Sequence, residues 1–267
     1  MERFFAIIAL ALFGVAFGSF SCCQVWRIRK KDKSKWSHCM HCKYRLQWYD
    51  NIPIVSWLAL GGKCRKCRKP IGCAEVLAEL GAALIFPLSF VWWPAQDKLM
   101  AVDVAEIVKF GLFLAILVIL IILFIYDAKW KELPVNLMVA TGVMAAVFWG
   151  ISVGQAYAET GQYDWLNFVF SLVFLPGVYF LLYKVSHECW VGGGDWILCV
   201  PLALMLGDMW LSLMCVFASN VIGCAVMLPV ALSKKKKKMV IPFGPFLISG
   251  FLLIFFLQDV ILKFVSF

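Results

Sequence analysis

Long apolar runs recur along this chain and constrain its fold more than any other feature. Runs of about 18 or more apolar residues are long enough to cross a hydrocarbon core of roughly 30 Å as helices. Hydrophobic residues make up 63% of the 267 positions and charged residues only 15%, which excludes an ordinary soluble domain. The short apolar–polar alternation of a membrane β-barrel is not found. We therefore predict an all-α polytopic membrane protein embedded in a lipid bilayer.

The apolar runs predict about eight transmembrane helices. The predicted spans are 4–26, 75–93, 107–126, 134–152, 166–184, 196–206, 210–230 and 241–262. The span 196–206 is too short to cross unaided, so we expect it to be tilted, broken or joined to its neighbour. The first span could instead be a cleaved signal peptide, but its length and the basic segment after it favour a retained helix.

The positions of the basic residues predict the topology. With eight crossings, the loops 27–74, 127–133, 185–195 and 231–240 share one face; with Lys184 at the edge of the third loop, they hold 21 of the 25 Lys and Arg residues. The positive-inside rule assigns that face to the cytoplasm.

The net charge of +9 therefore reports topology, and we expect no nucleic-acid partner. The run Lys234–Lys238 is interpreted as an anchor for the span before it, and it could also bind anionic lipid.

Four of the eleven cysteines form a pattern. Cys39 and Cys42 are followed, after a gap of 21 residues, by Cys64 and Cys67, all in the predicted cytoplasmic loop. Two Cys-x-x-Cys pairs in one polar loop are typical of a structural zinc site, in which four thiolates surround one tetrahedral ion. The alternative of two disulfides is disfavoured because the cytosol is reducing. The other seven cysteines are interpreted as small core residues.

Asp127 and Asp195 carry the chemical hypothesis. Both are predicted at the cytoplasmic ends of spans, where a carboxylate is costly and therefore informative. Two carboxylates that approach closely share a proton, so one can take a proton from water while the other protonates a carbonyl. Gly192, Gly193 and Gly194 would allow unusual backbone angles and close approach of a peptide. The alternative is that Asp127 is a solvated loop residue and Asp195 only caps a helix.

Glu75 and Glu79 are four residues apart at the start of the span 75–93 and so share a helical face. We interpret Glu75 as an interfacial charge. Glu79 lies a turn deeper, where that interpretation is weaker.

Taken in order, these motifs resemble the type IV prepilin peptidase family, the bacterial intramembrane aspartyl peptidases of the GxGD type. The resemblance runs almost from end to end and rests on "GSF" at 18–20, "DNIPIVSW" at 50–57, "GKCRKC" at 62–67, "GGGD" at 192–195 and "IPFGPFL" at 241–247. The chain departs from the family pattern at Cys22, at 74–76, at Val135 and at Ile197. None of these departures removes Asp127 or Asp195.

The resemblance implies an activity and a place for it. It implies that Asp127 and Asp195 cleave the leader of type IV prepilins or type II secretion pseudopilins, at the cytoplasmic face of the bacterial inner membrane. It also implies N-methylation of the new N-terminal residue with S-adenosylmethionine, linked to Glu79 and the cysteine loop.

The resulting domain plan has three parts. We expect a first transmembrane helix at 1–26, a cytoplasmic four-cysteine zinc-binding loop associated with methylation at 27–74, and a transmembrane peptidase core at 75–267. Two other functions remain open: a membrane thiol oxidoreductase that uses the Cys-x-x-Cys pairs, and a non-enzymatic homologue that handles pilins. The sequence gives no indication of the oligomeric state.

Overall fold

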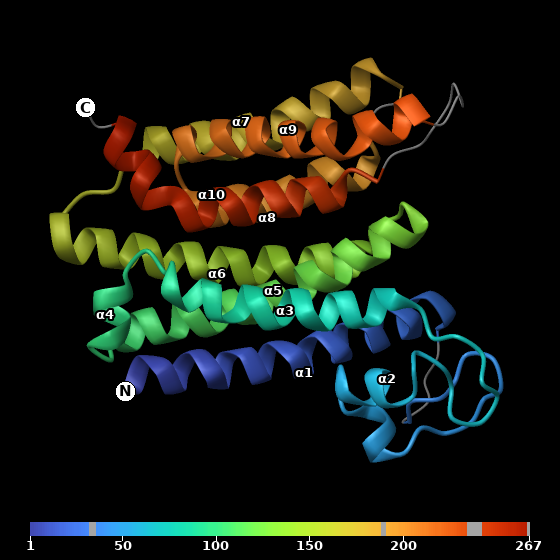
Figure 1. The fold of residues 1–267 in the computed structure, drawn as a ribbon. Helices are drawn as coiled ribbons and strands as arrows, with labels where there is room; N and C mark the ends of the chain where they lie inside the picture. The colour runs from blue at the N-terminus through green and yellow to red at the C-terminus, as the bar shows by residue number, and fades with distance from the viewer. Residues whose placement is uncertain (32–35, 188–190, 234–241, 266–267) are drawn as a thin grey trace. The chain divides into compact units, whose positions relative to one another are not determined.

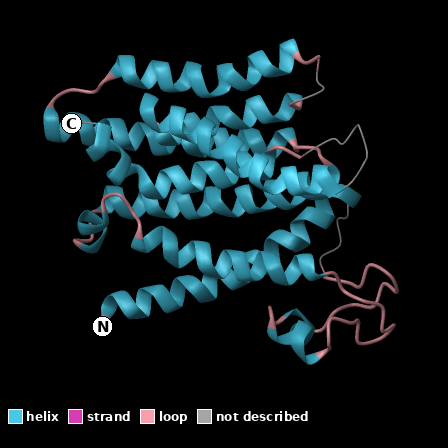
Figure 2. Ribbon diagram, turned by 45° about the horizontal axis from the view of Figure 1, so that its top comes forward, coloured by secondary structure: helices cyan, strands magenta, loops and turns pink. Residues whose placement is uncertain are grey.

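A computed structural model describes residues 1–31, 36–187, 191–233 and 242–265. Nearly all of the regular structure in these ranges is helical, as Figures 1 and 2 show. Seven of the described helices are long and apolar enough to cross a membrane, and a shorter apolar helix spans Gly193–Leu206. The prediction of an all-α polytopic membrane protein with about eight helices is confirmed. The run Lys234–Lys238 and Cys189 lie outside the described residues.

The chain divides into two compact units, Met1–Val91 and Trp92–Phe267, which are considered separately. The first contains α1 (Glu2–Lys30), η1 (Trp48–Asn51), α2 (Val55–Ala59) and α3 (Cys73–Val91). The second contains α4 (Gln96–Met100), α5 (Val104–Trp130), α6 (Val135–Thr160), α7 (Trp165–Val185), α8 (Gly193–Leu206), α9 (Met209–Ser233) and α10 (Gly244–Val265). The domain limits predicted at 1–26, 27–74 and 75–267 stay predictions.

In the first unit, α1 and α3 pack closely along one another because two glycines of α1 meet the backbone of α3. A Cβ atom at Gly18 would lie 2.7 Å from the Glu79 Cα and 2.9 Å from the Ala78 carbonyl oxygen. Gly14, one turn earlier, faces the Ala82 backbone in the same way. Small residues four apart allow helices to approach closely in lipid, where association depends on packing rather than on hydrophobic burial.

In the second unit, the short helix α8 is the buried centre. It contacts α6, α7, α9 and α10, and its residues Leu198, Cys199, Leu202 and Ala203 are fully buried. A helix of 14 residues is tolerated here because neighbouring helices, and not lipid, surround it. The span 196–206, expected to be unable to cross unaided, therefore lies inside the bundle.

The helix ends differ from the predicted spans where polar residues continue a helix. The predicted span 107–126 becomes α5, which runs on to Trp130 and stops at Lys131, a residue with φ of 58°. Likewise, α6 continues to Thr160 and stops at Gly161. Apolar content marks the membrane-embedded stretch, whereas a helix ends where the backbone turns into the left-handed region.

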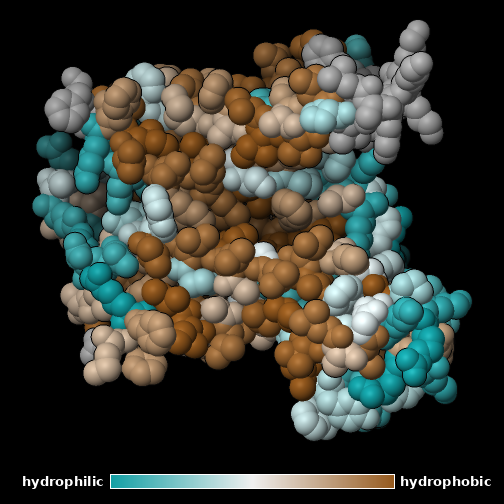
Figure 3. All heavy atoms as spheres, viewed as in Figure 1, coloured by the Kyte–Doolittle hydropathy of each residue, from teal (hydrophilic) through white to brown (hydrophobic). Residues whose placement is uncertain are grey.

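Figure 3 shows apolar side chains over the described helices and hydrophilic ones gathered near α2 and the cysteine loop.

The close α1–α3 contact yields a stability prediction. Gly18→Ala should lower the free energy of unfolding by about 1–3 kcal/mol, because the alanine methyl group would clash with the backbone of α3, which cannot move away as a side chain can. Gly81→Ala in α3 is the matched control, since a Cβ there meets nothing within 4 Å. Thermal unfolding of the detergent-solubilised variants measures both. Equal midpoints for the two variants would contradict the packing described here.

Candidate functional site

The four patterned cysteines lie on two turns with the same backbone geometry. In each turn the carbonyl of the first cysteine accepts the N–H of the fourth residue after it: Lys43 to Cys39 and Arg68 to Cys64, both at 3.0 Å. Lys43 and Arg68 each have a φ of 59°. The two segments are therefore structural repeats, and each presents two sulfurs from one tight turn.

The four sulfurs form a single cluster. All four lie within 4.8 Å of one another, with 3.9 Å between Cys39 and Cys67 and 4.0 Å between Cys42 and Cys64. A tetrahedral ion with metal–sulfur bonds of about 2.3 Å needs sulfur–sulfur edges of about 3.8 Å, so this spacing fits. All four cysteines are free thiols. The cluster can hold a metal ion.

Backbone N–H groups near the cluster change the pKa values of its thiols. N–H groups of Cys67 and Lys66 point at the Cys64 sulfur and, against the opposing effect of burial, lower its pKa to about 7. The backbone N–H of Lys69 lowers the pKa of Cys67, but burial and its hydrogen bonds to the other three sulfurs outweigh this and raise that pKa to about 11. Four neighbouring thiols cannot all ionise without a compensating positive charge. A bound cation would supply that charge.

The segment 50–57 connects the cysteine turns to α3. The Arg65 Nε donates to Asp50 at 2.7 Å, and the Asp50 carboxylate raises the pKa of that guanidinium. At the other end, the backbone N–H of Ile54 donates to Glu79 Oε2 at 2.7 Å. Ile54 has a φ of 60°, which is unusual for a β-branched residue. Glu79, only 6% exposed, thus holds a strained point of the segment against α3.

Asp127 lies in the last turn of α5 and is only 4% exposed. Its Oδ2 accepts the backbone N–H of Gly244, the first residue of α10, at 3.0 Å. A Cβ at Gly244 would lie 2.8 Å from this same oxygen, so only glycine fits the contact. The alternative interpretation of Asp127 as a solvated loop residue is wrong, because α5 continues past it and the carboxylate is buried.

Asp195 lies in the first turn of α8 and is 6% exposed. Its Oδ2 accepts the backbone N–H of Gly192 at 2.9 Å, so Asp195 does cap its own helix. None of Gly192, Gly193 and Gly194 has a positive φ, and the unusual backbone angles expected there are not found. Gly194 instead provides room, since a Cβ there would lie 3.0 Å from the Leu133 side chain.

The two aspartates are brought to the same end of the second unit. The contact between Gly194 and Leu133 joins the start of α8 to the segment that follows α5. Each carboxylate has one oxygen held by a glycine N–H from the start of a helix. Two buried, oriented carboxyl groups at one end of a helical bundle can share a proton when they approach closely.

No role is predicted for Gly244 from the sequence, although it lies in the motif "IPFGPFL" at 241–247. The available signal was a glycine followed by proline at the start of an apolar span, which is a helix N-terminus with N–H groups to offer. The partner could not be identified, because Asp127 lies 117 residues earlier.

Glu106 was also missed. It is buried in α5 and accepts hydrogen bonds from Trp93 Nε1, Lys109 Nζ and Gln155 Nε2 at 3.0 to 3.1 Å. Lys109 also donates to the Gln155 Oε1 at 2.9 Å. This network joins α5 to α6. We interpret it as structural, because the partners satisfy the buried carboxylate.

Comparison with known proteins identifies the family. Residues 12–93 match the model of the bacterial peptidase A24 N-terminal domain. The chain is 30% identical over 223 residues to a type 4 prepilin-like proteins leader peptide-processing enzyme of Escherichia coli O78:H11, covering 83% of this chain and 76% of that protein. No solved structure matches the chain.

Two further relatives are each called prepilin leader peptidase/N-methyltransferase. The protein of Dichelobacter nodosus is 29% identical over 220 residues, covering 81% of this chain and 69% of that protein. The protein of Vibrio cholerae is 27% identical over 262 residues, covering 94% and 96%. These matches extend over most of this chain and of the relatives. The chain therefore belongs to the bacterial prepilin leader peptidase/N-methyltransferase family.

Proposed function

We propose that this protein cleaves the leader from prepilin-like substrates and that Asp127 and Asp195 are its catalytic pair. The observation that carries the proposal is the pair of buried carboxylates at one end of the second unit, each oriented by a glycine N–H. Family membership supports the peptidase activity. The presence of both carboxylates also disfavours a non-enzymatic role, because a protein that only handles pilins would not need them.

The pair performs hydrolysis as a general acid and base. One aspartate, ionised, takes a proton from water as the water oxygen attacks the scissile carbonyl carbon. The other, protonated, gives its proton to the carbonyl oxygen. The tetrahedral species then collapses and the C–N bond breaks. The amine leaves with the proton from the aspartate that received one, and a hydroxyl proton of the tetrahedral species returns to the aspartate that gave one. The N–H groups of Gly192 and Gly244 hold the carboxylates in place during this exchange.

The charge distribution supports a side for the reaction. Most Lys and Arg residues lie in loops that the predicted topology puts on the same face as the span ends carrying Asp127 and Asp195. We therefore place the catalytic pair at the cytoplasmic face of the bacterial inner membrane. Type IV prepilins are the proposed substrates, because the relatives are named for processing prepilin or type 4 prepilin-like leaders. Type II secretion pseudopilins are proposed beside them because the motifs of the chain resemble those of the family.

Methylation of the new N-terminus is the second proposed reaction, since the relatives are named as N-methyltransferases. S-adenosylmethionine is the proposed co-substrate and supplies an electrophilic methyl group. The amine nitrogen attacks that carbon, the C–S bond breaks, and the amine proton passes to solvent. Glu79 supports this activity by holding the segment 50–57 through Ile54, rather than by touching the reacting atoms.

Zn²⁺ is the metal we propose for the four-cysteine cluster, because tetrahedral sulfur sites select it. Its role is to fix a loop that has few buried apolar residues of its own. A thiol oxidoreductase would pair Cys39 with Cys42 and Cys64 with Cys67. The close sulfur contacts instead run between the two turns, from Cys39 to Cys67 and from Cys42 to Cys64, which favours one shared ion.

Asp127→Asn and Asp195→Asn should each reduce leader cleavage by at least about a thousandfold, because asparagine keeps the shape but cannot exchange a proton. Asp164→Asn is the matched control. Asp164 also accepts an N–H at the start of a helix, from Asn167 at 3.0 Å. Mass measurement of a purified prepilin gives the readout. Wild-type cleavage by either catalytic variant would refute the assignment, as would an equal loss in the control.

Gly244→Ala should reduce kcat for leader cleavage by about tenfold or more, because the methyl group displaces the Asp127 carboxylate from its N–H. Gly142→Ala in α6 serves as control, since a Cβ there meets nothing within 4 Å. Cleavage rates and unfolding midpoints should be measured together. If Gly244→Ala lowers stability but leaves kcat unchanged, the contact is structural only.

Cys64→Ser should remove the bound metal, because three remaining thiols cannot complete the tetrahedron. Cys73→Ser is the control, since Cys73 is exposed and lies outside the cluster. Elemental analysis of the wild-type protein should give one zinc per chain, and the control should keep it. Metal-free wild-type protein with oxidised Cys-x-x-Cys pairs would instead support the oxidoreductase.

A further inference from the structure

The first turn of α10 has a single N–H group to offer the peptidase site. The N–H groups of Phe246 and Leu247 both donate to the Phe243 carbonyl, at 3.0 and 3.1 Å, so Phe243 is the residue that caps this helix. Pro245 has no N–H. Gly244 therefore carries the one free donor among these residues, and it uses that donor on the buried carboxylate of α5. If the start of α10 moved, no neighbouring N–H could take its place.

The ring of Phe243 is held by two other helices. Its centroid lies 5.2 Å from that of the Tyr179 ring of α7, with 48° between the ring planes. On α9, a Cβ at Gly223 would lie 3.8 Å from Phe243 Cε2. Aromatic pairs at this separation attract one another beyond the effect of burial alone. The residue that begins α10 is therefore attached to α7 and α9 through its side chain.

Tyr179 provides a fixed base for this contact. Its side chain is among the largest that are fully buried in the described part of the chain. Its hydroxyl accepts a hydrogen bond from Asn220 Nδ2 of α9 at 3.4 Å, and α7 packs against both α8 and α9. A side chain buried in a close-packed interior has few alternative positions. The Tyr179 ring therefore limits where the Phe243 ring can lie.

A close contact between helices sets the axis of α10. A Cβ at Gly250 would lie 2.8 Å from the backbone nitrogen of Ser219 in α9 and 2.9 Å from its Cα. Only glycine allows the two backbones to come this close, as at other small-residue contacts between membrane helices. The Gly250 contact fixes the line of the helix, and Phe243 fixes where the helix begins. Together they determine where the Gly244 N–H points.

We propose that Phe243 and Tyr179 are positioning residues for leader cleavage, an inference that rests on the proposed catalytic role of Asp127. They act through Gly244, because the ring pair holds the start of α10 where its one free N–H meets the Asp127 carboxylate. Without the Phe243 ring the start of the helix shifts, and the carboxylate loses its orientation. A small displacement of a catalytic group lowers the rate of reaction and leaves substrate binding unchanged.

Kinetics of leader cleavage by Phe243→Leu give the first test. Leucine keeps an apolar side chain but removes the ring, so kcat should fall by about tenfold or more while KM stays within about twofold of the wild-type value. Tyr179→Leu should have the same effect. Tyr179→Phe keeps the ring and should cleave as the wild type does, because Asn220 Nδ2 still has the Val216 carbonyl as an acceptor, at 2.8 Å.

Phe256→Leu is the matched control. Phe256 is also a partly buried phenylalanine with two ring neighbours, Phe113 and Phe255, both at 6.2 Å, but it lies about three turns further along α10. Its replacement should leave kcat unchanged. Unfolding midpoints should be measured for every variant, because Tyr179→Leu opens a cavity in the core. If that variant does not fold, Phe243→Leu decides the question, since Phe243 is partly exposed.

A double variant separates positioning from a general structural effect. If Phe243 acts only through Gly244, Phe243→Leu should cause no further loss of kcat in a protein that already carries Gly244→Ala. A purely structural contribution would make the two losses multiply. That result would overturn the proposal, and so would a wild-type kcat for Phe243→Leu.

The outcomes also distinguish the positioning role from the function on which it rests. If Asp127→Asn abolishes cleavage while Phe243→Leu and Tyr179→Leu keep the wild-type kcat, the peptidase assignment stands and the positioning role falls. If Asp127→Asn cleaves as the wild type does, both fall. A higher KM with an unchanged kcat for Phe243→Leu would place that residue in substrate binding and would also overturn the positioning role.

Discussion

The hydrogen bond from the Gly244 N–H to Asp127 is the contact on which the arrangement of the proposed peptidase site depends. A carboxylate at a helix end inside an apolar bundle needs a partner, and the first N–H groups of a helix are donors without an intrahelical acceptor. The start of α10 therefore meets the end of α5, and the start of α8 supplies the matching donor for Asp195. The proposed chemistry uses helix ends that would otherwise be unsatisfied.

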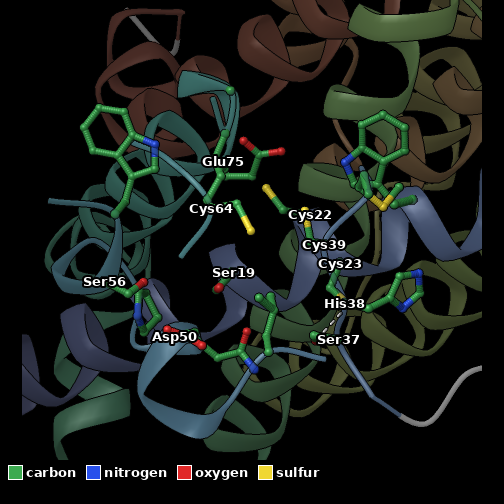
Figure 4. Close-up of a pocket in the computed structure, with 18 of the residues that line it drawn as sticks. Ser19, Cys22, Cys23, Ser37, His38, Cys39, Asp50, Ser56, Cys64 and Glu75 are labelled. Carbon is green, nitrogen blue, oxygen red and sulfur yellow. Dashed lines mark hydrogen bonds between the residues drawn. The ribbon is translucent and has the colours of Figure 1, made fainter. Parts of the chain in front are cut away.

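In the first unit, too, a buried carboxylate accepts a backbone N–H and fixes a neighbouring segment. Glu79 in α3 accepts the N–H of Ile54 and so fixes a strained segment beside the cysteine turns. That loop has little apolar core, so its order depends on such polar contacts and, in our proposal, on a metal ion. A loop held open in this way encloses a cavity of about 870 Å³ (Figure 4), whose lining includes two buried polar atoms without a hydrogen-bond partner in the described part of the chain, Glu75 Oε2 and Trp57 Nε1.

The sequence predicted those features that depend on local pattern. Apolar length identified the helices, and the spacing of Cys39, Cys42, Cys64 and Cys67 predicted a cluster that the described fold does contain. Contacts between segments that are far apart in the chain could not be predicted from the sequence. The burial of Asp127 followed from how far α5 extends, and its donor is 117 residues away. The cavity at Glu75 and Trp57 depends on how α1, the cysteine turns, the segment 50–57 and the start of α3 fold together, and no sequence periodicity shows this. The catalytic roles themselves stay predictions.

The central claim is that Asp127 and Asp195 act as one proton-sharing unit, and a double-variant kinetic cycle tests it most directly. Single-turnover cleavage of a prepilin should be measured for the wild type, for each Asp→Asn variant and for the variant carrying both changes. If the two carboxylates act together, the double variant should lose no more activity than either single variant. Losses that multiply in the double variant would show two independent contributions and contradict the account.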